Sequence, residues 1–175
     1  MNLEQELRAP LRASAIPDLD IVSHGAEQTR RLGAHLGALL RDGDLVLLEG
    51  EFGTGKTTFT QGIAQGMGIE SRYVNSPTFT LINEYRGEQA VLNHMDLYRL
   101  EGVEQVATLG LDDYLDGEGI TVIEWPDEAS PWLPDEALVV RFSHLNETKR
   151  TLRFFSEGTR YKTLMESFTK SAYGL

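Results

Sequence analysis

The chain has 175 residues, of which 41% are hydrophobic and 25% charged, a composition typical of one globular domain with a real core. It contains no cysteine, which excludes disulfides, thiolate zinc sites and thiol catalysis and suits a cytoplasmic location. A net charge of −11 opposes direct binding of DNA or RNA, because such binding needs clustered lysine or arginine, so any contact with nucleic acid is expected only through a partner protein.

The start of the chain is expected to be a loose arm over residues 1–19, because Pro10 and Pro17 interrupt regular structure. This segment is acidic and has no apolar central stretch, so neither a signal peptide nor a transit peptide is expected. A run of about 18 apolar residues is also missing from the sequence, so we expect no membrane-spanning segment.

Regular elements are predicted from the periodicity of apolar residues. Residues 26–40 have helical spacing, and after a turn at 42–44 the short apolar run Asp44–Glu49 predicts a buried strand. A second helix is predicted over Lys56–Met67. The further elements expected in chain order are a loop and strand within 71–86, a strand over 90–95, a helix over 103–115, a strand over 120–123, a loop over 126–136, antiparallel strands over 137–145 and 150–155, and a helix over 159–173. Alternating strands and helices predict a three-layer α/β fold whose sheet is mostly parallel, with antiparallel additions.

A phosphate-binding loop is predicted from GEFGTGKT, Gly50 to Thr57, which matches the pattern G-x-x-x-x-G-K-[ST]. Its glycines let the backbone curl so that several N–H groups point at phosphate oxygens. Lys56 is expected to reach the β- and γ-phosphates, and Thr57 is expected to offer its hydroxyl to Mg²⁺. The residues expected to bind the nucleotide within this segment are Glu51, Phe52, Gly53, Thr54, Gly55, Lys56, Thr57 and Thr58.

The alternative for this segment is a glycine turn that matches the pattern by accident. The loop follows a predicted buried strand and opens a predicted helix, and this context favours nucleotide binding. We therefore expect ATP with Mg²⁺ as the ligands, a P-loop NTPase-like fold, and a single P-loop ATPase domain over residues 20–175.

Two carboxylates follow predicted strands and are candidates for the chemistry beyond binding. Hydrolysis needs a second contact to Mg²⁺ and a group that positions water, usually at the carboxyl end of a neighbouring strand. Glu124 ends the apolar run ITVIE, and Asp96 ends AVLNHMD. A solvated charge at a strand end is the alternative for each, and the residues alone do not decide which carboxylate orients the water.

Five segments in order carry a resemblance to a known family. GEFGTGKTTFTQGIAQGMG, SPTFTLINEY, HMDLYRL, LGLDDYL and VIEWPDEA, within about Ala26 to Ala137, resemble the bacterial TsaE (YjeE) family. The second and third segments are more selective than the loop itself. Glu51 and Thr54 depart from the family's frequent aspartate and alanine, and the segment after Ala137 has no matching motif.

The resemblance implies a small ATPase that works with the TsaD and TsaB subunits to make threonylcarbamoyladenosine next to the anticodon of tRNA, and that hydrolyses ATP weakly without them. It implies that Thr57 and Glu124 hold Mg²⁺ and that Asp96 is important for activity. By the same resemblance Thr29 lies near the nucleotide, and Ser76, Pro77 and Thr78 belong to a switch-like segment facing the γ-phosphate. Lys56, Asp96 and Glu124 are thus the expected catalytic residues.

Other functions of a phosphate loop remain alternatives. A small P-loop kinase acting on a metabolite or nucleotide needs a lid rich in arginine, and residues 125–136 contain none. A GTP-dependent switch needs a base-reading N-K-x-D segment, which the sequence lacks. Among single residues, His94 is expected to be packed inside its strand, whereas Trp125 is compatible both with a packed aromatic and with contact to a base or partner.

Overall fold

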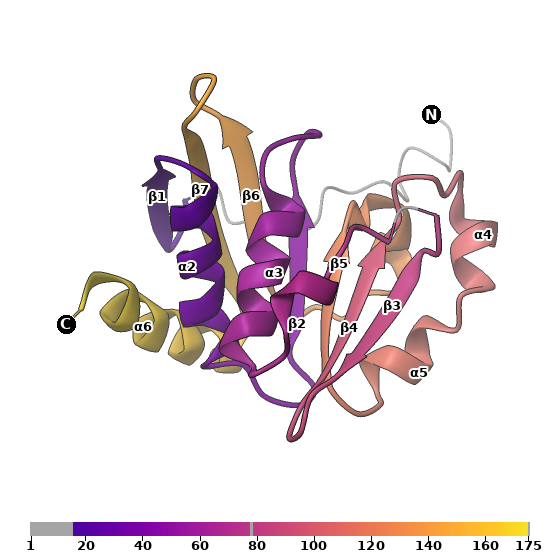
Figure 1. The fold of residues 1–175 in the computed structure, drawn as a ribbon. Coiled ribbons are helices and arrows are strands. Elements are labelled where there is room, and N and C mark those ends of the chain that lie inside the picture. The colour runs from indigo at the N-terminus through magenta and orange to yellow at the C-terminus, as the bar shows by residue number, and fades with distance from the viewer. Residues whose placement is uncertain (1–15, 78, 175) are drawn as a thin grey trace.

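The computed structural model describes residues 16–77 and 79–174, and within them seven strands form one sheet in the order β1-β7-β6-β2-β5-β4-β3 (Figure 1). The strands are β1 (Leu19–Ser23), β2 (Leu45–Glu49), β3 (Ile82–Arg86), β4 (Val91–Asp96), β5 (Ile120–Glu124), β6 (Ala137–His144) and β7 (Arg150–Glu157). Strands β6, β2, β5 and β4 run parallel, whereas β1, β7 and β3 add antiparallel pairs at the two sides. The predicted sheet, mostly parallel with antiparallel additions, is confirmed.

Helices cover both faces of this sheet and complete three layers (Figure 1). On one face lie α2 (Ala26–Gly37), α3 (Lys56–Gly66) and α6 (Thr159–Tyr173), and on the other lie α4 (Val103–Ala107), α5 (Leu111–Leu115) and the 3₁₀ helix η2 (Pro126–Trp132). A short 3₁₀ helix, η1 (Ser71–Tyr73), follows α3. Strands β2, β4 and β5 are buried between the layers, which explains why β2 and β5 are apolar without alternation.

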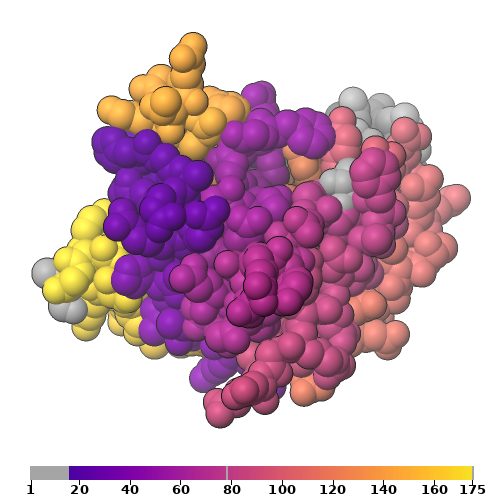
Figure 2. Space-filling model, in the orientation of Figure 1, coloured from indigo at the N-terminus to yellow at the C-terminus, as the bar shows by residue number. Residues whose placement is uncertain are grey.

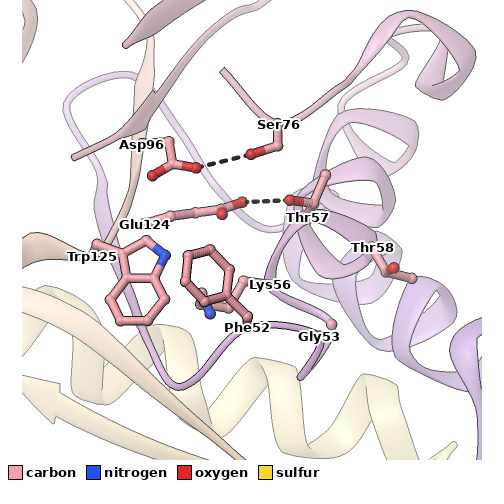
Figure 3. Close-up of a pocket in the computed structure, with 10 residues that line it drawn as sticks. Phe52, Gly53, Lys56, Thr57, Thr58, Ser76, Asp96, Glu124 and Trp125 are labelled. Atoms are coloured by element: carbon pink, nitrogen blue, oxygen red, sulfur yellow. Dashed lines mark hydrogen bonds between the residues drawn. The ribbon is translucent and has the colours of Figure 1, made fainter. Parts of the chain in front are cut away.

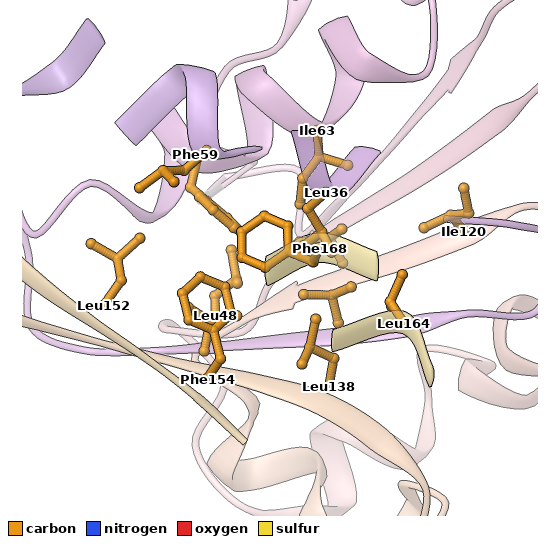
Figure 4. Close-up of a cluster of buried hydrophobic side chains, with 14 of the residues drawn as sticks. Leu36, Leu48, Phe59, Ile63, Ile120, Leu138, Leu152, Phe154, Leu164 and Phe168 are labelled. Carbon is orange, nitrogen blue, oxygen red and sulfur yellow. The ribbon is translucent and has the colours of Figure 1, made fainter. Parts of the chain in front are cut away.

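The larger hydrophobic core lies between β7, β6, β2 and the helices α2, α3 and α6. Phe154 contacts Phe59 of α3 and Phe168 of α6, with ring centroids 6.2 and 5.0 Å apart (Figure 4). All three phenylalanines are fully buried. Each such side chain contributes about 1.5–3 kcal/mol through its removal from water, so this core holds α3, and with it the loop that precedes α3, against the sheet.

Helices α2 and α3 pack backbone to backbone through glycines on both. A Cβ added to Gly62 would lie 2.1 Å from the carbonyl oxygen of Arg30, and one added to Gly33 would lie 2.2 Å from the carbonyl oxygen of Phe59. Only glycine allows so close an approach. The crossing brings α2 against the start of α3, and therefore close to the phosphate loop.

Three local predictions were wrong. Strand β1 was not predicted, although it pairs with β7 and is preceded by Asp18, whose carboxylate accepts hydrogen bonds from the N–H and hydroxyl of Ser156. The predicted helix over 103–115 is two short helices, because Gly110 takes a left-handed conformation between them with φ of 66°. Part of the predicted loop over 126–136 forms η2. Most of the predicted arm, residues 1–15, lies outside the described residues.

The hairpin between β6 and β7 projects at the same end of the molecule as the phosphate loop, and the two lie next to each other on the surface (Figure 2). This is also the end at which β2, β4 and β5 present their carboxyl termini. In the described part of the chain, no helix combines the length and apolar character needed to cross a membrane.

Candidate nucleotide-binding site

The predicted loop connects β2 to α3 in a conformation that requires glycine. Gly50 and Gly53 have φ angles of 141° and 71°, a region that residues with a Cβ rarely adopt. A Cβ on Gly50 would also lie 2.5 Å from the carbonyl oxygen of Phe142 on β6. The hydroxyl of Thr54 donates to the carbonyl oxygen of Glu51 at 2.7 Å and closes the loop on itself. The curl expected from the motif is therefore present.

Lys56 is buried at the start of α3, and its side chain folds back over the loop. Its Nζ donates to the carbonyl oxygens of Gly50 and Glu51 at 2.5 and 2.8 Å, and it lies 4.5 Å from the centroid of the Trp125 ring. Burial lowers the pKa of Lys56, against the opposing effect of Glu124 and Asp96. The lysine thus lies among carbonyl groups, a ring and two carboxylates at the place where a phosphate would enter.

Glu124 ends β5 and points at the first turn of α3. The hydroxyl of Thr57 donates to its Oε1 at 3.0 Å, and Nε2 of His94 donates to the same oxygen at 3.0 Å. His94 is fully buried, as predicted for a packed histidine, but its partner is the carboxylate of the site. Its Nδ1 has no hydrogen-bond partner among the described residues.

Asp96 ends β4 and lies beside Glu124, with which it is paired in the parallel register. Its Oδ2 accepts a hydrogen bond from the hydroxyl of Ser76 at 2.8 Å, and its Oδ1 accepts one from the backbone N–H of Tyr98 at 3.0 Å. Figure 3 shows Ser76 and Asp96 next to Thr57 and Glu124. The two candidate carboxylates are therefore brought together, although 28 positions separate them in the sequence (124 − 96).

These residues line one pocket of about 330 Å³. Its lining residues are Phe52, Gly53, Gly55, Lys56, Thr57, Thr58, Ser76, Asp96, Glu124 and Trp125. Most of the predicted site residues are in this lining, whereas Glu51, Thr54 and Thr29 are not. Thr29 is buried behind the loop, where its hydroxyl lies 2.7 Å from that of Ser23 and its methyl group lies 3.5 Å from the position of a Cβ on Gly55. Thr78 lies outside the described residues.

An aromatic cluster at the pocket was not predicted. The rings of Phe52, Tyr98 and Trp125 pack with centroids 4.3 to 5.1 Å apart, and the first two are about half exposed. Trp125 has a left-handed backbone with φ of 55°, and its N–H donates to the carbonyl oxygen of Leu48. The guanidinium of Arg99 lies over the ring of Phe79, 4.1 Å from its centroid. The alternation of His94 with Asp96 on one face of β4 was the sequence signal for His94.

The oxygen atoms of this pocket fit a hard divalent cation bound together with a nucleotide. The Thr57 hydroxyl and the Glu124 carboxylate are adjacent oxygen ligands, the type that Mg²⁺ prefers. Within residues 16–77 and 79–174, no group of three or more histidine and acidic side chains gathers to hold a metal.

A buried strand, a curled glycine loop, a lysine and a helix N-terminus, placed at the carboxyl edge of a mostly parallel sheet, define a protein of the P-loop NTPase-like α/β class. A family model described as threonylcarbamoyl adenosine biosynthesis protein TsaE matches residues 23–152. The chain belongs to the TsaE family, which confirms the resemblance carried by the five sequence segments.

Individual relatives agree with this assignment. The tRNA threonylcarbamoyladenosine biosynthesis protein TsaE of Bacillus subtilis is 40% identical over 82% of this chain and 89% of its own length. The protein of the same name from a Nostoc species is 44% identical over 71% of this chain and 77% of its own length. The crystal structure of Bacillus subtilis YdiB superposes with a TM-score of 0.77 at 34% identity, covering 90% of this chain and 98% of that one.

Proposed function

We propose that this chain is the Mg²⁺-dependent ATPase subunit of a bacterial complex that makes threonylcarbamoyladenosine next to the anticodon of tRNA, and that ATP hydrolysis supports turnover of the complex. TsaD and TsaB are the proposed partner subunits. Membership of the TsaE family supports the pathway, and the pocket supports the activity. The observation that carries the proposal is the hydrogen bond between Thr57 and Glu124 beside Lys56, because it joins a loop hydroxyl to a strand-end carboxylate.

Binding of ATP is assigned to the loop and to Lys56. Backbone N–H groups of the loop and the N-terminus of α3 attract the phosphates, and Lys56 exchanges its bonds to the Gly50 and Glu51 carbonyls for phosphate oxygens. Thr57 and Glu124 would hold Mg²⁺, which when bound neutralises charge on the β- and γ-phosphates. The half-exposed ring of Phe52 packs against Trp125 and lines the same pocket.

Asp96 is the carboxylate that we assign to the attacking water. The Oε1 of Glu124 accepts one hydrogen bond from Thr57 and one from His94, which hold the carboxylate beside the loop hydroxyl in a position that suits contact with a metal. Asp96 is oriented from two other sides, by Ser76 and by the N–H of Tyr98, and it also lines the pocket. A carboxylate in this position accepts a hydrogen bond from water and aligns it with the γ-phosphate.

The kinase alternative receives no support from the pocket. None of the described residues that line it is an arginine, whereas a phosphoryl-transfer lid relies on arginine to cover the transferred group. Segment η2, which would be the lid, is acidic in its first turn and packs on the sheet through Ala129.

The test is ATP hydrolysis by the purified chain with and without TsaD and TsaB, alongside a scan for phosphorylated metabolites and nucleotides. The proposal predicts slow hydrolysis by the chain alone and a clear increase with both partners. Stoichiometric phosphorylation of a small molecule, with no response to the partners, contradicts the proposal and favours the kinase.

A further inference from the structure

The hairpin between β6 and β7 contacts the phosphate loop from outside the pocket. His144 and Arg150 are paired across the end of this hairpin, in the register of the two strands. Both side chains donate to backbone carbonyls of the loop, although more than 90 residues separate them from it. Figures 1 and 2 place the hairpin next to the loop at one end of the molecule.

The guanidinium of Arg150 donates hydrogen bonds both to the hairpin turn and to the phosphate loop. Nη1 donates to carbonyl oxygens of the hairpin turn, those of Asn146 and Lys149 at 3.0 Å and of Glu147 at 3.2 Å. Nη2 and Nε donate to the carbonyl oxygen of Gly53 at 3.2 and 3.3 Å. The planar guanidinium of arginine has enough donors to bond the carbonyls of the hairpin turn and that of Gly53 at the same time, whereas a lysine ammonium cannot reach both.

The contacts on two successive carbonyls determine where the loop N–H groups point. Nε2 of His144 donates to the carbonyl oxygen of Phe52 at 3.3 Å, one residue before the carbonyl that Arg150 holds. In a planar trans peptide the C=O and the following N–H point in opposite directions. When the carbonyls of Phe52 and Gly53 turn outward to the hairpin, the N–H groups of Gly53 and Thr54 turn away from it. The carbonyls of Gly50 and Glu51 turn the other way, toward Lys56.

We propose that the β6–β7 hairpin is a clamp on the phosphate loop, and that Arg150 is the positioning residue that aims the N–H groups of Gly53 and Thr54 at a bound polyphosphate. His144 assists on the preceding peptide. The clamp rests on the proposed binding of ATP to this loop. It contributes to affinity through preorganisation, because N–H groups already aimed at the anion need no ordering when it binds.

The test compares ATP and pyrophosphate binding by calorimetry in the full chain and three variants. Arg150→Gln removes the fork, Arg150→Lys keeps the charge without the fork, and Arg153→Gln is the matched control on the same strand, where Arg153 pairs with Asp20 at the surface. Arg150→Gln is expected to weaken both ligands by about three- to tenfold, the effect of losing about one ordinary hydrogen bond, because the bonds from Arg150 to Gly53 are exposed to water. Arg150→Lys is expected to restore less than half of that loss, and Arg153→Gln is expected to bind like the unaltered chain.

A further variant tests the contact that His144 makes with the phosphate loop. His144→Ala removes the contact to Phe52, and it is expected to weaken pyrophosphate by about twofold, as befits a single exposed hydrogen bond of 3.3 Å. Full affinity in Arg150→Gln would overturn the clamp, because Arg150 would then contribute nothing to binding. Full rescue by Arg150→Lys would also overturn it, because the positive charge alone would then explain the role of Arg150. Failure of the unaltered chain to bind ATP contradicts the proposed function as well, so the two failures are distinguishable.

Discussion

Replacing His94 by leucine should destabilise the chain and weaken its response to Mg²⁺. His94 is fully buried and Glu124 is 3% exposed, so their 3.0 Å hydrogen bond has no competition from water. Hydrogen bonds to charged groups contribute about 1.5–3 kcal/mol, and the hydroxyl of Thr57 remains as a second donor to the same oxygen. We expect a loss of about 2 kcal/mol in the free energy of unfolding.

His94→Gln is the matched control, because its amide nitrogen can donate from a position close to that of Nε2. Urea unfolding at neutral pH measures both variants, with an unchanged slope showing that the compactness of the states is preserved. We expect the glutamine variant to lose less than half as much stability as the leucine variant. Calorimetry of ATP binding with Mg²⁺ and with a chelator gives a second measurement, in which His94→Leu should weaken binding only when Mg²⁺ is present. Equal stability of the two variants, or an equal loss of affinity with and without Mg²⁺, would refute the positioning of Glu124 by His94.

Two further predictions concern the packing of α3 and β2, the elements that the phosphate loop connects. Gly62→Ala should lower the melting temperature through a loss of about 1–3 kcal/mol, because the new Cβ would lie 2.1 Å from the carbonyl oxygen of Arg30, whereas Gly25→Ala, with open space around it, should change it by far less. Tyr161→Phe removes the acceptor for the N–H of Leu45 and should cost about 1 kcal/mol at pH 7 by urea unfolding. Burial raises the pKa of Tyr161 in the folded chain above its ordinary value of 10.0. The stabilising contribution of Tyr161 is therefore complete below pH 10.0 and is lost as the pH rises through the folded-state pKa. In that alkaline range, the difference in stability between wild type and Tyr161→Phe should shrink. A Gly25→Ala loss as large as that of Gly62→Ala, or a Tyr161→Phe difference that is constant through the alkaline range, would contradict these two accounts.

The phosphate loop was predictable because its chemistry is local. Glycine at positions with positive φ, a lysine and a hydroxyl are all read within eight consecutive residues, Gly50 to Thr57. The carboxylates were predictable because parallel strands end at one edge of the sheet, which brings Asp96 and Glu124 together.

Features that depend on tertiary contacts were not predictable. Strand β1 is short and only partly buried, and it is stabilised by pairing with β7, which lies more than 120 residues away in the sequence. The partners of His94 and Arg150 lie on other elements, so the spacing of His94 from Asp96 could not reveal its bond to Glu124, and no local pattern pointed to Arg150. The helical pattern over 103–115 was misleading because Gly110 has a left-handed backbone that interrupts it.

The most direct measurement is the Mg²⁺ dependence of ATP hydrolysis, assayed with both partner subunits, for Lys56→Ala and Glu124→Ala. The matched controls are Lys162→Ala on α6 and Glu104→Ala on α4, where the replaced side chains are exposed and remote from the pocket. The account predicts that both site variants abolish hydrolysis while both controls retain it. Full Mg²⁺-dependent hydrolysis by Glu124→Ala would contradict the assignment of the metal, and full hydrolysis by Lys56→Ala would contradict the phosphate loop as the site of ATP.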